Sequence, residues 1–168
     1  MTEIRGETVV LRPLEEADAA TLRAIREHPE VHAWWGPLED DFPQADEPTS
    51  FRFAILLDGE LVGMAQFSEE SEPDYRHAEI DLFLDPRVRG RGLGPDTVRA
   101  LADHLVAERG HHRIVIGAAV DNRAAVRAYE KAGFRPVGVT ERSWRDPEGR
   151  WRDELLMERV ETVVDSGG

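Results

Sequence analysis

Apolar and polar positions alternate with two different periods along this chain, and the changes of period predict the order of its elements. Between residues 15 and 26, Ala19, Leu22 and Ile25 recur at helical spacing, which is typical of an amphipathic helix. Residues 76–84 instead alternate as a strand with two unlike faces does. One face carries Ala78, Ile80, Leu82 and Leu84, and the other carries His77, Glu79, Asp81 and Phe83.

Turn and breaker residues divide the remaining chain into further elements. Asp58-Gly59 between two apolar runs predicts a hairpin, and residues 38–50, rich in Asp, Glu and Pro, predict a long loop. The predicted strands are 8–13, 51–57, 60–67, 76–84, 113–118, 134–140 and 151–159, and the predicted helices are 15–26, 30–35, about 94–108 and 122–132. This order predicts an α/β fold (an α+β mixed sheet) with helices on both faces. We expect one domain over residues 1–160 and a disordered tail over residues 161–168.

A glycine loop follows the strand 76–84 and precedes the next helix. Residues 89–94 read Arg-Gly-Arg-Gly-Leu-Gly, and Pro95 suits the first helical turn. Glycines let the backbone turn its N–H groups inward, and a helix N-terminus adds unpaired donors, so the loop predicts a diphosphate site. A tight turn with solvated arginines is the plainer alternative. The spacing G-x-G-x-G does not match the dinucleotide fingerprint, and no Gly-Lys-Ser/Thr follows for a P-loop.

Composition narrows the function classes. The chain has 168 residues, no cysteine and a formal net charge of −13, from 34 acidic and 21 basic residues. A field of this sign disfavours nucleic acid and favours cationic solutes, although it also serves solubility. We expect no signal peptide and no membrane span, hence a cytoplasmic location. The six histidines show no metal-ligand spacing with nearby carboxylates, so we predict no metal.

Two motifs together resemble the GNAT acetyltransferase superfamily. Arg89, Gly92 and Gly94 match its acyl-CoA-binding motif Gln/Arg-x-x-Gly-x-Gly/Ala, and residues 122–134 are similar to its Asn-x-x-Ala-x-x-x-Tyr-x-x-x-Gly-Phe segment. The resemblance implies a GNAT-like acyl-CoA N-acyltransferase fold and acetyl-CoA as cofactor. It assigns CoA binding to Phe83, Leu84, Arg89, Gly90, Arg91, Gly92, Leu93, Gly94, Pro95, Asn122, Ala125 and Tyr129.

The resemblance also implies the chemistry of two side chains. Tyr129 matches the family's tyrosine, which can protonate the departing thiolate, and a phenol is a neutral donor at pH 7. Asp81 is the first candidate for the base that deprotonates the amine, with Glu79 beside it. A packed helix aromatic and a solvated strand face are the structural alternatives for these residues.

Further segments resemble the aminoglycoside 6'-N-acetyltransferase branch. They are Val31 to Gly36 with its paired tryptophans, Gly63-Met64-Ala65-Gln66, and Ile80-Asp81. The residues expected to bind the acceptor are Trp34, Trp35, Asp40, Glu79 and Asp81, with Asp41, Asp46 or Glu47 as further carboxylates of the same loop. We expect at least one tryptophan to belong to the core.

These observations predict an acetyl-CoA-dependent N-acetyltransferase that acts on a primary amine of a small cationic substrate, first an aminoglycoside at its 6'-amine. The alternatives are another small amine, a protein N-terminus of the ribosomal-protein type, and a non-catalytic acyl-CoA-binding module. We expect no nucleic-acid or membrane partner, and a monomer or homodimer.

Overall fold

The computed structural model describes residues 2–44 and 48–162, and these form one mixed sheet with helices on both sides. The strands are β1 (Ile4–Arg5), β2 (Val9–Pro13), β3 (Ser50–Leu57), β4 (Glu60–Glu70), β5 (His77–Leu84), β6 (Arg113–Ala119), β7 (Arg135–Arg145) and β8 (Trp151–Val160). The α-helices are α1 (Ala19–Glu27), α2 (Pro29–Trp35), α3 (Leu93–Ala107) and α4 (Arg123–Lys131), and the short 3-10 turns are Glu16–Asp18 and Pro86–Val88. The prediction of a mixed α/β sheet is confirmed.

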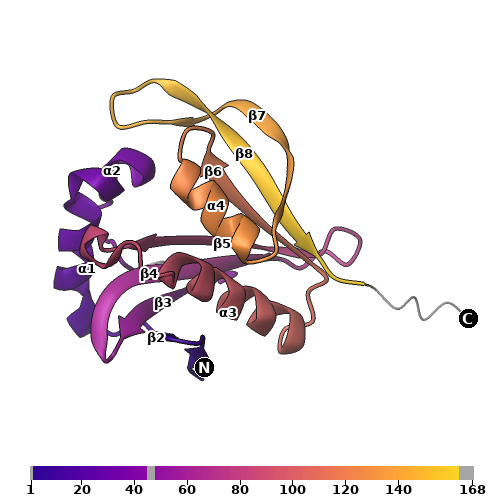
Figure 1. Ribbon diagram of the computed structural model, residues 1–168, viewed down its shortest axis with the longest axis horizontal. Helices are drawn as coiled ribbons and strands as arrows, with labels where there is room; N and C mark the ends of the chain where they lie inside the picture. Colours follow the sequence, from indigo (N-terminus) through magenta and orange to yellow (C-terminus); the bar gives the residue numbers. More distant parts are fainter. Residues whose placement is uncertain (1, 45–47, 163–168) are drawn as a thin grey trace, which may run out of the picture.

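The sheet has the strand order β1-β2-β3-β4-β5-β6-β8-β7, and its neighbours are antiparallel except for β5 and β6. The parallel register joins Ala78 to Ile114, Glu79 to Val115 and Ile80 to Ile116, and it ends there. Beyond these pairs the two strands diverge, and Figure 1 shows β6, β8 and β7 running obliquely to β4 and β5. The middle of the sheet therefore opens at the carboxyl ends of β5 and β6.

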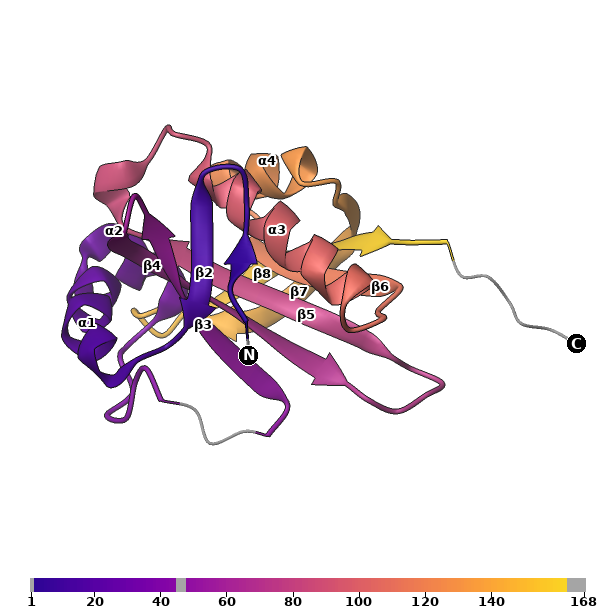
Figure 2. The same ribbon diagram turned by 90° about the horizontal axis from the view of Figure 1, so that it is seen from below.

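Two apolar clusters cover the two faces of the sheet. The larger one joins α3 and α4 to strand residues such as Ile80 and Ile116. The smaller one packs Leu22 and Ile25 of α1 against Phe83 and neighbouring side chains. Figures 1 and 2 show α1 with α2 and α3 with α4 on different sides of the strands. Apolar side chains therefore pack against both faces of β5, although Glu79 on its polar face stays exposed.

Asp96 in the first turn of α3 ties this helix to the β1–β2 turn. Its carboxylate accepts hydrogen bonds from the backbone N–H groups of Glu7, Thr8 and Val9 at 2.8, 2.9 and 3.0 Å. The hydroxyl of Thr8 donates a fourth bond at 3.0 Å. The first turn of α3, which continues the glycine loop, is thus anchored to the far edge of the sheet.

Local signals placed most elements correctly, and the differences are one missed edge strand and the ends of two others, since β4 continues beyond residue 67 to Glu70. The short strand β1 was not predicted, and β7 continues beyond residue 140 to Arg145, through irregular pairing with β8. Part of the expected tail, residues 163–168, lies outside the described residues. Among the described residues, no helix has the length and apolar character needed to cross a membrane.

Candidate active site

A cavity of about 700 Å³ occupies the opening between the diverging ends of β5 and β6. Its walls come from α2, from the ends of both strands, from the beginning of α3 and from α4, and the β7–β8 hairpin closes another side. Catalytic and binding residues often lie at such irregular places, because a break in strand pairing exposes polar groups that a continuous sheet would cover. The opening is therefore the first place to look for chemistry.

The glycine loop lies at one end of this cavity and has the predicted shape. Gly90 and Gly92 have φ angles of 77° and 74°, and a Cβ at either position would meet nothing within 4 Å. Gly92 is the N-cap of α3, which begins at Leu93. Among the described residues, no backbone carbonyl accepts a hydrogen bond from the N–H groups of residues 90–94. Consecutive free donors at a helix N-terminus can bind a diphosphate.

Arg89 is held at the start of this loop by an exposed ion pair with Glu30 of α2, at 3.1 Å. The pair connects the glycine loop to the helix that carries the two tryptophans. An exposed ion pair contributes little stability, and Arg89 still lines the cavity. Its charge is therefore shared between Glu30 and any anion bound at the loop.

Helix α4 presents Tyr129 to the same cavity. The side chain of Asn122 caps this helix by accepting a hydrogen bond from the N–H of Ala125 at 3.3 Å. Tyr129 lies about two turns further on and is only 7% exposed, and its hydroxyl has no hydrogen-bond partner among the described residues. Burial, with the charges of Asp81 and Glu154, raises its pKa above the ordinary value. The phenol is therefore a neutral donor over the whole physiological range.

Asp81 lies in the wall between this cavity and a second one of about 650 Å³ on the α1 side of the sheet. Burial raises its pKa to about 7, and the charges of Glu79 and Glu154 act in the same direction. The N–H of Leu82 donates to its Oδ1 at 2.9 Å, which opposes the shift. A carboxylate with a pKa near neutrality is suited to accept a proton from an amine.

The second cavity has a mostly acidic and polar lining. Its charged and amide side chains are Glu39, Asp41, Gln44, Arg52, Gln66, Glu79 and Asp81. The Oε1 atom of Gln66 is buried and has no hydrogen-bond partner among the described residues. The guanidinium of Arg52 donates to the carbonyls of Pro43 and Gln44, at 2.8 and 3.0 Å, and so fixes the adjacent loop.

The two tryptophans of α2 have different roles. Trp35 packs edge-on against Phe83, with ring centroids 5.1 Å apart, and belongs to the smaller apolar cluster. The buried guanidinium of Arg26 lies 5.1 Å from the centre of the Trp35 ring. Trp34 instead lies beside Trp144 of β7, with ring centroids 6.5 Å apart. Both tryptophans line the cavity, and one of them is also part of the core.

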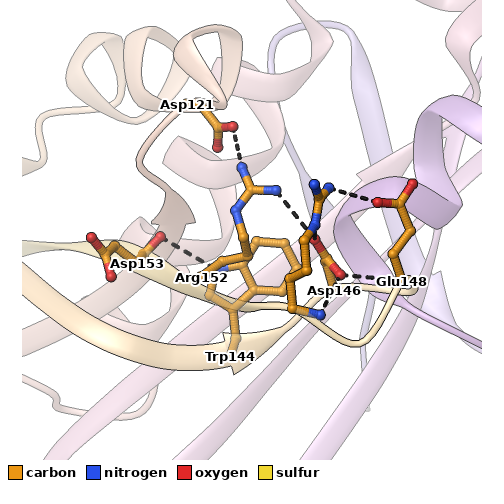
Figure 3. Close-up of polar contacts among 7 residues, drawn as sticks. Asp121, Trp144, Asp146, Glu148, Arg152 and Asp153 are labelled. Carbon is orange, nitrogen blue, oxygen red and sulfur yellow. Dashed lines mark hydrogen bonds and ion pairs between the residues drawn. The ribbon is translucent and has the colours of Figure 1, made fainter.

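The β7–β8 hairpin is held over the cavity by a polar network (Figure 3). Arg152 forms ion pairs with Asp121, which precedes α4, and with Asp146 at the end of the hairpin. The indole Nε1 of Trp144 donates to the carbonyl of Asp153 at 3.3 Å. These contacts fix the side chain that faces Trp34.

The structure brings together many of the residues that the sequence singled out, but not all. Around the first cavity lie Trp34, Trp35, Asp81, Phe83, Leu84, Arg89, Gly94, Asn122, Ala125 and Tyr129. The loop residues Gly90, Arg91, Gly92, Leu93 and Pro95 lie beside the cavity in sequence and are not part of its lining. Asp40 is exposed and lines neither cavity, whereas Glu79 lines the second. Asp46 and Glu47 lie outside the described residues.

Sequence reasoning missed Glu154, Trp144 and Arg145, which line the first cavity from β7 and β8. Period-2 alternation assigns residues to one face of a strand, but it does not say which strand is the neighbour. The sequence signal for Glu154 is its alternation with Leu155 in a predicted strand. That signal acquires a meaning only once β8 is known to pair with β6.

Comparisons with known proteins agree with this geometry. Residues 8–135 match the family described as acetyltransferase (GNAT) domain. Aminoglycoside N(6')-acetyltransferase type 1 from Klebsiella pneumoniae is 29% identical, over 80% of this chain and 77% of the relative. L-amino acid N-acetyltransferase AaaT from Escherichia coli (strain K12) is 27% identical, over 90% of this chain and 98% of the relative. The solved structure of AAC(6')-Ib with paromomycin and acetyl-CoA is 28% identical, with a TM-score of 0.75 over 92% of this chain and 94% of that one.

Proposed function

Because the chain belongs to the GNAT acetyltransferase family, whose members act on amines with acetyl-CoA, we propose that its acceptor is an aminoglycoside acetylated on the 6'-amine. The single observation that supports the reaction most strongly is the position of Asp81. Among the residues that line the two cavities, it alone lines both. A base in that wall can reach an amine that enters from one side and an acetyl group that is held on the other.

The residues of the first cavity fit acetyl-CoA. The free N–H groups of residues 90–94 would bind the diphosphate, and the open space at Gly90 and Gly92 leaves room for it. Phe83, Leu84, Asn122 and Ala125 would contact the pantetheine arm along the diverging strands and α4. When bound, acetyl-CoA supplies a thioester carbonyl carbon that an amine can attack.

Asp81 and Tyr129 then divide the proton transfers. The ionised carboxylate of Asp81 takes a proton from the acceptor nitrogen, directly or through water, so that the nitrogen lone pair forms the new C–N bond. The hydroxyl of Tyr129 donates its proton as the C–S bond breaks, and the phenolate recovers a proton from solvent. The raised pKa of Tyr129 keeps the proton available until the sulfur leaves.

The acceptor side favours a cation with ring surfaces. Glu39, Asp41 and Glu79 line the second cavity, and carboxylates can bind the ammonium groups of an aminoglycoside. Trp34 and Trp144 offer aromatic faces on which a sugar ring can pack. An L-amino acid or another small amine is the second candidate, because a relative with that activity matches nearly the whole chain.

The test uses neomycin B and paromomycin, which differ in a 6'-amine and a 6'-hydroxyl. Release of free CoA from acetyl-CoA by the purified protein is followed with a thiol reagent, alongside spermidine, L-amino acids and N-terminal peptides. Saturable release with neomycin B and none with paromomycin supports the proposal. Equal release with both antibiotics moves the acetylated amine elsewhere on the molecule, and release with amino acids alone replaces the aminoglycoside by the second candidate.

A further inference from the structure

Glu154 of β8 lines the opening of the sheet, in the same cavity as Asp81. Its strand pairs with β6, and Glu154 lies opposite Ala119 in that register. The carboxyl group extends over Gly117, where an added Cβ would lie only 2.5 Å from it. The absence of a side chain at Gly117 therefore makes room for the Glu154 carboxylate, which lines the same cavity as Asp81 and Tyr129.

Glu154 has neither an ion-pair partner nor a side-chain hydrogen bond among the described residues. Glu158, four residues later on the same face of β8, shows the contrast. It pairs with Arg113 at 3.0 Å and with Arg135 at 2.9 Å. The same face of β8 thus carries Glu158, whose carboxylate is ion-paired outside the cavity, and Glu154, whose carboxylate lies inside it and has no ion pair among the described residues.

The groups that surround Glu154 are complementary to an ammonium ion. Burial and the charge of Glu79 raise the pKa of Glu154, and Glu154 in turn acts on Asp81. Tyr129 lines the same cavity and is only 7% exposed, and its hydroxyl has no hydrogen-bond partner among the described residues. Half-buried carboxylates beside an unpartnered hydroxyl are stabilised by a ligand that brings positive charge and N–H donors.

We propose that Glu154 binds a second ammonium group of the acceptor, so that the enzyme selects substrates with two amines. One amine would lie at Asp81 for acetylation, and the other would be held by the Glu154 carboxylate across the opening of the sheet. This inference rests on the proposed acetyl transfer and adds a substrate class to it, compounds with two or more amines. Aminoglycosides belong to this class because each carries several amines. Glu154 would be a specificity-determining residue that does not take part in proton transfer.

The test compares unbranched diamines of three, four and five carbons with the monoamines of the same length. Glu154→Gln keeps the shape of the side chain and removes its charge. The ratio of kcat/KM for the best diamine to kcat/KM for its monoamine is expected to fall by about 10-fold to 100-fold. Gly117→Ala is expected to lower the same ratio, because the new Cβ displaces the Glu154 carboxylate. Glu148→Gln, an exposed glutamate of the same hairpin paired with Arg150 at 2.7 Å, is the matched control and should leave the ratio unchanged.

A ratio unchanged by Glu154→Gln, or an equal loss for diamine and monoamine, overturns the inference. Calorimetric binding of both amines to the CoA-loaded protein separates this inference from the proposed function. One outcome is that the wild-type protein binds the diamine more tightly than the monoamine, with this preference absent from the Glu154→Gln variant, and yet releases no CoA. In that case the role of Glu154 in binding the second amine holds and the proposed acetyl transfer fails. If the wild-type protein acetylates amines but binds the diamine no better than the monoamine, the proposed acetyl transfer holds and the proposed role of Glu154 fails.

Discussion

Replacement of Asp81 by Asn is expected to make the protein more stable and nearly inactive. The carboxylate is partly buried, and among the described residues its one hydrogen bond comes from the N–H of Leu82. The charges of Glu79 and Glu154 act on it. An asparagine of the same shape keeps an oxygen that can accept the Leu82 bond. It removes the negative charge, which the folded protein holds at a cost.

The magnitude follows from the pKa. Burial, helped by the neighbouring carboxylates, raises the pKa of Asp81 from 3.8 to about 7. Since one pKa unit corresponds to about 1.4 kcal/mol, holding the ionised form in the folded protein costs roughly 4–5 kcal/mol. The folded state binds this proton more tightly than the unfolded state. The contribution of Asp81 to stability is therefore fully present below pH 3.8, declines as the pH rises toward 7, and is lost above it.

The assay is urea unfolding of both proteins between about pH 4 and pH 9, with acetyl-transfer rates measured on the same samples. Asp81→Asn should match the wild type near the acid end and exceed its free energy of unfolding by roughly 4 kcal/mol above neutrality. Its kcat should fall by about 100-fold to 10,000-fold. In the wild type, kcat/KM should rise with pH through the pKa near 7.

Asp18→Asn is the matched control with the opposite sign. Arg12 donates two hydrogen bonds to Asp18, at 2.7 and 2.9 Å, and lowers its pKa. This variant should lose stability at neutral pH, and the difference from the wild type should shrink as the pH falls through the lowered pKa. If Asp81→Asn proves less stable at alkaline pH, or if its difference from the wild type does not depend on pH, Asp81 is not a buried carboxylate held near neutrality and the reasoning is refuted.

Three further changes test other parts of the structure. Tyr129→Phe should lower kcat by at least about 100-fold. CoA affinity, measured by calorimetry, should stay within about threefold, because the hydroxyl has no partner among the described residues. A matching loss of CoA affinity would contradict a role of Tyr129 as the acid. Asp96→Ala should lower the free energy of unfolding in urea by about 2–4 kcal/mol, because the N–H groups of Glu7, Thr8 and Val9 lose their acceptor. A loss below about 0.5 kcal/mol would show that Asp96 does not hold α3 to the β1–β2 turn. Arg26→Met should raise KM for the acceptor by about 10-fold and leave CoA affinity unchanged. The reason is that the guanidinium donates hydrogen bonds to the carbonyls of Gly36 and Pro37 and lies beside Trp35. An equal effect on CoA affinity would argue for general unfolding of the site.

The sequence predicts those elements whose signals are local. Asp58 and Gly59 both have positive φ, as the turn dipeptide predicts for a two-residue hairpin. Pro29 begins α2, and Gly36 ends it with a φ of 77°. The long β7 depends instead on pairing with β8, and its side chains are nearly all exposed. No apolar alternation marks residues 141–145, so the continuation of the strand to Arg145 could not be predicted from residues 134–145 alone.

The candidate site divides in the same way. The glycine loop and the Asn122 to Tyr129 spacing lie within single segments, and each is recognisable in the sequence. The position of Asp81 between two cavities requires knowledge of the whole fold, because the two cavities are lined by different sets of elements. Glu154 requires the strand order β6-β8-β7, which brings a residue from the end of the chain beside Gly117. Pairings of this kind depend on the whole fold.

The negative charge that matters for acceptor choice is local, not the net charge of the chain. Many carboxylates of this protein are neutralised by arginines, as Glu69 is by Arg109 and Asp146 is by Arg152. Among the described residues, Asp81 and Glu154 form no ion pair, although both are partly buried and burial makes an unpaired charge costly. A surface charge is screened within about 8 Å at physiological salt, so the total of −13 attracts cations only weakly and without selectivity. An uncompensated cluster inside the sheet opening lowers stability in the free protein, and a cationic acceptor relieves that cost only when it binds there. Affinity for the acceptor should therefore depend on salt less than the general attraction of cations to the surface does.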